Sequence, residues 1–193
     1  HYNGKIPRNP FAMYHVDPDH KEREFLTLDE LTAMTEIKLE DPNMAFARDL
    51  FIFGCWTGIS FIDIKNLTED NISMINGAPW IVSKRQKTGV PFQIKLMDIP
   101  MQIIGRYKAF RKGSHLFNIG NLDSINKRIK KVAAMCGIKK RISYHVSRHS
   151  FAVLSLEYGM PIETVSKILG HTNITTTQIY AKVTSTKLEH DIS

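Results

Sequence analysis

The sequence lacks the features that define several common protein classes. It has only two cysteines, Cys55 and Cys136, which stand far apart with no Cys-x-x-Cys spacing. We therefore expect buried, reduced thiols rather than a disulfide framework or a cysteine zinc site. No apolar run approaches the roughly 20 residues that span a bilayer, and the N-terminus does not resemble a signal peptide. These absences predict a cytoplasmic protein without a membrane partner.

Patterns for nucleotide and metal binding are missing as well. Gly89 and Gly120 belong to no glycine-rich phosphate loop, so nucleotide hydrolysis has no support. His145 and His149 are four residues apart, but no third ligand stands nearby and Arg148 lies between them. We therefore predict no metal site and no cofactor.

Acidic residues are scarce over one long stretch of the chain. Residues 71–156 contain 16 Lys and Arg but only two acids, Asp98 and Asp123, whereas the remainder contains 10 Lys and Arg against 17 acids. The formal net charge of +7 is thus concentrated in one half of the chain. A solvated basic surface rarely has one sign over such a length, so the pattern favours a polyanion-binding face.

The 193 residues are enough for one well-buried domain. Hydrophobic periodicity and capping signals predict helices at about 27–39, 43–56, 63–67, 98–111, 123–136, 144–158 and 161–170, with a last one from about 175. Between them, alternation and the turns Asn76-Gly77 and Lys87-Thr88-Gly89 predict three strands near 71–75, 80–82 and 90–96. The expected fold is mainly α with a small three-stranded antiparallel β-sheet.

Five residues carry chemistry in a particular order. Lys87 lies at the tip of the predicted hairpin, and His145 and Arg148 share one face of a helix. Arginine suits a phosphate because its planar fork donates two parallel hydrogen bonds, whereas lysine and histidine can transfer protons. His171 follows in Leu169-Gly170-His171, and Tyr180 comes nine residues later with a hydroxyl that can attack phosphorus. Each of these residue types alone more often has a structural role. The five in this order, within a basic half-chain, indicate a functional site.

In this order the residues resemble the tyrosine recombinase family, which includes phage integrases and the Xer recombinases. The flanking sequence is similar too: Trp56-Thr57-Gly58, Asp63-Ile64-Lys65-Asn66-Leu67, Lys87-Thr88-Gly89 and Arg148-His149-Ser150-Phe151-Ala152. The resemblance covers about residues 26–185, and its wording is most similar to integrases of Bacteroides-type mobile elements. It implies the tyrosine recombinase catalytic-domain fold.

The resemblance also implies a mechanism that needs neither metal nor ATP. Tyr180 would attack the scissile DNA phosphate to give a 3′-phosphotyrosyl enzyme, while Arg148 stabilises charge on the non-bridging oxygens. His145 would assist the tyrosine proton, His171 would hydrogen-bond the phosphate, and Lys87 would protonate the leaving 5′-oxygen. The implied function is a site-specific DNA recombinase or integrase. Two alternatives stay open, a catalytically inactive DNA-binding relative and a type IB topoisomerase.

Domain organisation and partners follow from the same resemblance. Residues 1–24 would be a linker from a missing N-terminal DNA-binding region, and 25–193 the catalytic domain, with a tail at about 182–193 that docks on a neighbouring protomer. Expected partners are double-stranded recombination sites, further copies of the chain in a tetramer on DNA, and accessory DNA-bending proteins. The expected location is the bacterial nucleoid.

The family pattern is broken at one position. An arginine normally follows Thr-Gly-aliphatic, but Thr57-Gly58-Ile59 is followed by Ser60. One phosphate-binding arginine is thus missing, and Arg48 is the substitute we predict, because it lies on an otherwise uncharged face of an apolar helix. Lys65 is a weaker candidate, and a salt bridge from Arg48 to Asp49 or Asp63 is the competing interpretation.

Further basic residues are predicted to contact DNA phosphates. They lie on the hairpin and around the helix at 123–136: Lys84, Arg85, Lys127, Arg128, Lys130, Lys131, Lys139, Lys140 and Arg141.

Overall fold

The computed structural model of the chain describes residues 24–182. The predicted N-terminal linker and the docking tail therefore lie almost wholly outside the described residues. In chain order the elements are α1 (Leu28–Glu36), α2 (Pro42–Thr57), α3 (Phe61–Lys65), β1 (Ile72–Ile75), β2 (Ala78–Lys84), β3 (Pro91–Lys95), α4 (Asp98–Arg106), α5 (Leu122–Met135), α6 (Tyr144–Glu157) and α7 (Ile162–Leu169), with 3-10 turns at Glu69–Asn71 and Lys108–Phe110 and a helical segment over 175–182. The mainly helical prediction with one small sheet is confirmed.

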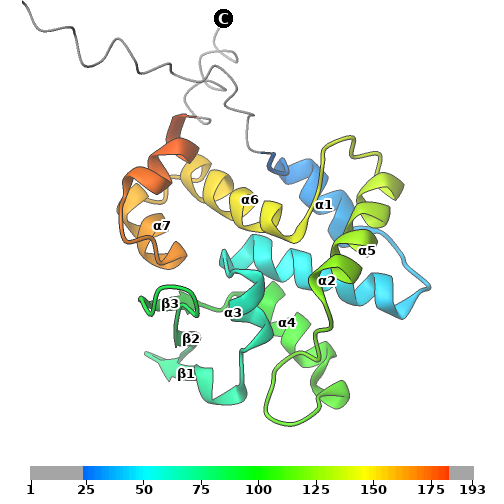
Figure 1. Cartoon of the computed structure of the whole chain (residues 1–193), viewed down its shortest axis with the longest axis horizontal. Helices are drawn as coiled ribbons and strands as arrows, with labels where there is room; N and C mark the ends of the chain where they lie inside the picture. The colour runs from blue at the N-terminus through cyan, green and yellow to red at the C-terminus, as the bar shows by residue number, and fades with distance from the viewer. Residues whose placement is uncertain (1–23, 183–193) are drawn as a thin grey trace, which may run out of the picture.

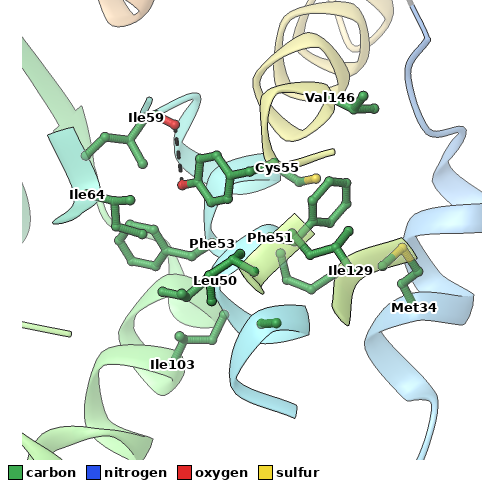
Figure 2. Packing of buried hydrophobic residues seen from close by; sticks show 14 of the residues in the cluster. Met34, Leu50, Phe51, Phe53, Cys55, Ile59, Ile64, Ile103, Ile129 and Val146 are labelled. Carbon is green, nitrogen blue, oxygen red and sulfur yellow. Dashed lines mark hydrogen bonds between the residues drawn. The ribbon is translucent and has the colours of Figure 1, made fainter. Parts of the chain in front are cut away.

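Helix α2 forms the centre of the helical part. It packs against α1, α4, α5 and α6, and Leu50, Phe51 and Phe53 are completely buried. Figure 2 shows these side chains surrounded by residues of the neighbouring helices, among them Ile103 and Ile129. Burying a side chain of this size contributes about 1.5–3 kcal/mol, which explains why a helix that is apolar almost all round lies at the core. Asp41 accepts hydrogen bonds from the first turn of α2, where Pro42 suits the first helical position.

The sheet is an antiparallel meander in the order β1-β2-β3. Asn76 and Gly77 have φ values of 49° and 75°, the left-handed pair that a tight hairpin requires. In β3 the buried Phe92 and Ile94 alternate with exposed neighbours. Figure 1 shows the sheet at one end of the helical body with α7 above β3, and β3 and α7 are in contact. The hairpin therefore reaches the C-terminal part of the fold.

Two predicted helices are shorter than their sequence pattern suggested. α1 ends at Glu36 rather than near Leu39, and α4 ends at Arg106 rather than Arg111. The guanidinium of Arg48 accounts for the first difference, because its Nη1 donates to the carbonyl oxygens of Met34, Thr35 and Ile37 and so satisfies the end of the helix. Within residues 24–182 no helix is long and apolar enough to cross a membrane.

Helices α2 and α6 approach each other closely at Gly54. A Cβ atom built on Gly54 would overlap Ser147 Oγ and lie 2.9 Å from Ser147 Cβ, and Ser147 is fully buried. Gly105 in α4 offers a matched comparison, because a Cβ atom there meets nothing within 4 Å.

We predict opposite stability changes for Gly54→Ala and Gly105→Ala. The first substitution overpacks the α2–α6 contact and should lower the free energy of unfolding by about 1–3 kcal/mol. The second only removes backbone freedom from the unfolded chain and should raise it by about 0.5–1 kcal/mol. Urea denaturation of both variants measures the difference. Equal effects at the two positions would contradict the close helix contact.

Candidate active site

Four parts of the fold supply the predicted active-site residues. Helix α6 carries His145 and Arg148, the turn after α7 carries His171, and the helical segment 175–182 carries Tyr180. Lys87 lies exposed in the turn between β2 and β3. Because β3 contacts α7 and α7 contacts α6, the fold brings elements that are distant in sequence to one region.

Arg148 is fixed by the ends of two helices. Its Nη1 donates to Gly58 O at 2.8 Å and its Nη2 to Leu169 O at 2.5 Å. Gly58 caps α2 with φ of 63°, and a Cβ atom there would come within 2.6 Å of the Phe151 ring. Burial, and to a smaller extent the nearby charge of Arg85, lower the pKa of Arg148 to about 10, although Tyr180, Asp63 and Tyr144 oppose the shift. The guanidinium is therefore still charged at neutral pH.

Arg85 is the functional candidate that the sequence analysis misplaced. It follows β2 directly and was predicted to contact DNA from the hairpin surface, but it is only 5% exposed. Its Nη1 donates to Asp63 Oδ2 at 2.8 Å, its Nη2 donates to Ile168 O at 2.5 Å, and its guanidinium carbon lies 3.9 Å from the centroid of the Phe92 ring. Burial lowers its pKa, although Asp63 opposes that shift. The side chain therefore points into the protein rather than along the hairpin surface.

Asp63 joins Arg85 to the position where the family arginine is missing. One carboxylate oxygen accepts from Ser60 Oγ at 2.6 Å as well as from Arg85, and the other accepts from the backbone N–H of Gln86 at 2.9 Å. The guanidinium of Arg85 thus shares a carboxylate oxygen with Ser60. Arg85, which follows β2, thereby places its guanidinium close to position 60, where the family arginine is missing.

Arg85 and Arg148 form a pair of neighbouring cations. Their Nη2 atoms bind consecutive carbonyl groups, of Ile168 and Leu169, and the charge of Arg85 lowers the pKa of Arg148. Each guanidinium has five N–H donors, and the buried Nε of Arg85 has no hydrogen-bond partner among the described residues. Two adjacent guanidiniums with spare donors are suited to an anion that carries charge on two oxygens.

Arg48 lies elsewhere, in the N-terminal half of α2. Its Nε donates to Asp49 Oδ1 at 2.6 Å, and its Nη1 binds the last carbonyls of α1. Asp49 in turn accepts from Arg106 and from Tyr107. Arg48 precedes Gly58 by ten residues, which is about 15 Å along a helix, whereas Arg148 contacts Gly58 itself. The salt bridge from Arg48 to Asp49 is therefore present. Arg48 does not lie beside Arg148, where a substitute for the arginine missing at position 60 would be needed.

The histidines and the tyrosine form a second group. Tyr180 is 3% exposed, and its hydroxyl lies 2.7 Å from His149 Nδ1. The His149 ring packs edge-on against that of His145, with ring centroids 4.4 Å apart. His171 Nδ1 lies 2.8 Å from Thr177 Oγ1, a contact within the loop and helix that carry Tyr180. Tyr180 raises the pKa of Arg148, so its hydroxyl belongs to the same electrostatic environment.

The predicted DNA-contacting residues differ in exposure. Six of the nine are exposed on the described surface: Lys84, Lys127, Lys130, Lys131, Lys139 and Arg141. Lys140 is half-buried and binds Glu30 and the carbonyl of Phe25, and Arg128 binds Ser124. With Arg85 buried, the exposed basic surface is smaller than the sequence suggested and is richest on α5 and the loop after it.

The model of the Phage integrase family matches residues 24–187, and the chain belongs to this family.

Several known proteins align with most of this chain. The tyrosine recombinase XerC of Natranaerobius thermophilus is 43% identical over 202 aligned positions, which cover 95% of this chain and 67% of that protein. The XerH site-specific recombinase bound to palindromic difH substrate in a post-cleavage complex has a similar fold, with a TM-score of 0.75 at 20% identity over 90% of this chain and 53% of that one. The catalytic domain of bacteriophage HP1 integrase matches with a TM-score of 0.62 at 21% identity, covering 89% of this chain and 94% of that domain.

The chain spans about two thirds of the length of the curated relatives that it matches. It therefore corresponds to one part of these longer proteins.

Proposed function

We propose that the chain is the catalytic domain of a site-specific tyrosine recombinase, which cleaves and rejoins double-stranded DNA through a 3′-phosphotyrosyl intermediate. The observation that carries the proposal is the pairing of Arg148 with Arg85 in a site that also contains the hydroxyl of Tyr180. Membership of the Phage integrase family supports it. The phosphate of a DNA strand is the anion that fits two adjacent guanidiniums and a nucleophilic tyrosine.

In this proposal Arg148 and Arg85 bind the two non-bridging oxygens of the scissile phosphate. Charge on these oxygens must be stabilised as the fifth bond to phosphorus forms. Asp63 keeps Arg85 charged and directs it toward Arg148. Arg85 thereby replaces the arginine that is absent at Ser60, and the main argument for an inactive DNA-binding relative disappears.

The bond changes of the reaction involve the remaining residues. Tyr180 Oη forms a bond to phosphorus as the bond from phosphorus to the 5′-oxygen breaks. Lys87, on the turn of the hairpin, donates a proton to the leaving 5′-oxygen. His145 assists removal of the hydroxyl proton of Tyr180, and His171 donates a hydrogen bond to the phosphate. The phosphotyrosyl ester conserves the energy of the broken bond, so a second DNA strand can displace Tyr180 without ATP.

We also propose the wider context of the reaction. The exposed basic residues of α5 and its following loop contact the DNA backbone, and several copies of the chain, four in the complete assembly, act on two recombination sites with accessory DNA-bending proteins. The motif wording favours an integrase of a Bacteroides-type mobile element that works in the nucleoid. Lys84 and Lys87 would place the hairpin on the same DNA face.

We predict that Tyr180→Phe abolishes the covalent protein–DNA adduct and leaves DNA affinity within about twofold of wild type. The substitution removes one hydroxyl and little volume, so packing in the cluster with Phe151 and Val165 should survive. A nicked half-site DNA traps the adduct, which is detected as a band that resists SDS and is sensitive to protease. An adduct of unchanged yield with the phenylalanine variant would contradict the assignment of the nucleophile.

We predict that Arg85→Lys slows cleavage by about 10²–10³-fold, the cost of removing one preorganised donor to transition-state charge. Lysine keeps the positive charge beside Asp63 but loses the planar fork. The matched control is Arg106→Lys, because Arg106 also pairs with a buried aspartate, but its side chain is 53% exposed and its partner Asp49 lies nine residues before Gly58. Single-turnover rates on the nicked half-site provide the measurement.

Adding Ser60→Arg to Arg85→Ala should restore part of the lost rate, since the new side chain would start beside Asp63. Wild-type cleavage by a folded Arg85→Lys protein, or an equal loss in Arg106→Lys, would show that Arg85 is not the second phosphate cation.

A further inference from the structure

The nucleophile is hydrogen-bonded to a histidine that the family motif does not assign to the reaction. Tyr180 Oη lies 2.7 Å from His149 Nδ1, and the two rings are tilted by 47° with centroids 5.4 Å apart. Both residues are almost completely buried, at 3% and 7% exposure. The contact joins α6 to the helical segment 175–182, which are 31 residues apart in sequence.

The direction of this hydrogen bond depends on the tautomer of the imidazole ring. A tyrosine hydroxyl donates its proton, and a neutral imidazole accepts at Nδ1 when its own proton is on Nε2. This arrangement is the one that general-base removal of the hydroxyl proton requires, and the separation is within the 2.6–3.2 Å range of a proton-transfer pair. No rearrangement of His149 is then needed before the tyrosine loses its proton.

His145 occupies a different position relative to the nucleophile. It lies one helical turn before His149, is exposed, and packs its ring edge-on against the buried His149 ring. Arg148 is the residue next to His149 and belongs to the electrostatic environment of Tyr180. On α6, therefore, the exposed His145 can contact DNA, whereas the buried His149 contacts the hydroxyl of Tyr180.

We propose that His149, rather than His145, accepts the proton of Tyr180 during cleavage. The inference rests on the proposed function and adds a catalytic residue to it. As the Oη–P bond forms and the P–O5′ bond breaks, the Oη proton moves to His149 Nδ1, and the 5′-oxygen receives a proton from Lys87. In religation the 5′-hydroxyl attacks phosphorus and returns its proton to Lys87, while the P–Oη bond breaks and His149 returns its proton to Tyr180 Oη. Protons and charge therefore balance over a cycle.

The same contact also has a purely structural interpretation, in which a buried hydroxyl needs a hydrogen-bond partner. The two interpretations differ in what an asparagine at position 149 should do. The Oδ1 atom of asparagine can occupy the place of Nδ1 and accept the hydrogen bond, but it cannot hold a proton at neutral pH. His149→Asn therefore retains the positioning and removes the proton acceptor.

The test compares His149→Asn, His149→Ala and His145→Asn in the 193-residue chain, using the nicked half-site DNA at saturating concentration. We expect His149→Asn to melt near the wild-type temperature, to bind DNA with unchanged affinity, and to form the Tyr180 adduct about 10²–10⁴-fold more slowly, the usual contribution of a general base. Added imidazole should raise the rate of His149→Ala toward wild type, because it can enter the space of the lost ring. The His145→Asn rate should fall less and should not respond to imidazole.

The outcomes separate this inference from the proposed function. If the wild-type chain forms no adduct, the function itself is wrong and the inference falls with it. If wild type forms the adduct at Tyr180 and His149→Asn reacts within threefold of it, the hydrogen bond only positions the hydroxyl and the proton-transfer role is wrong. Rescue of His145→Asn by imidazole, without rescue of His149→Ala, would assign the proton to His145 instead.

Discussion

The buried ion pair between Arg85 and Asp63 is the interaction on which the site depends. Each partner has a side chain about 95% buried, and breaking such a pair by removing one member typically costs about 3–5 kcal/mol because a charge remains uncompensated. The pair connects the end of β2 to α3, and the second hydrogen bond of Arg85 reaches the end of α7. These contacts hold the small sheet against α3 and α7 (Figure 1).

The same pair sets the electrostatics of the proposed reaction. Asp63 offsets one of the two neighbouring guanidiniums, so the site keeps a positive charge that an incoming phosphate can neutralise. Gly58 and Gly170 are necessary for this packing, since both have positive φ and a Cβ atom on Gly170 would come within 2.7 Å of Arg85 Nε. Tyr180, the proposed nucleophile, lies on a third element, and its hydroxyl is hydrogen-bonded to His149. The hydroxyl of Tyr180 is therefore held in place before DNA binds.

Local sequence signals predicted much of this arrangement. The period of α2 predicted its burial, and Asn76-Gly77 predicted the hairpin. The predicted site residues His145 and Arg148 lie on α6, His171 in the turn after α7, and Tyr180 in the helical segment 175–182. Arg85 was predicted on the hairpin surface although strand alternation could have placed it inside, because residues 81, 83 and 85 share a face and Ile81 is fully buried. Arg48 was chosen because an arginine in an apolar helix needs partners. Those partners are the last carbonyls of α1, a tertiary contact that periodicity cannot reveal, and one that also explains why α1 ends early.

Two arginines from separate elements, Arg148 and Arg85, are proposed to bind one DNA phosphate. A crystal structure of the Tyr180→Phe protein with an uncleaved half-site measures this directly. The account predicts N–O distances of about 2.7–2.9 Å, as in charge-assisted hydrogen bonds, from both Arg148 and Arg85 to the non-bridging oxygens of the scissile phosphate. A phosphate bound by Arg148 while the nearest nitrogen of Arg85 stays more than about 5 Å away, beyond hydrogen-bond range, would contradict it.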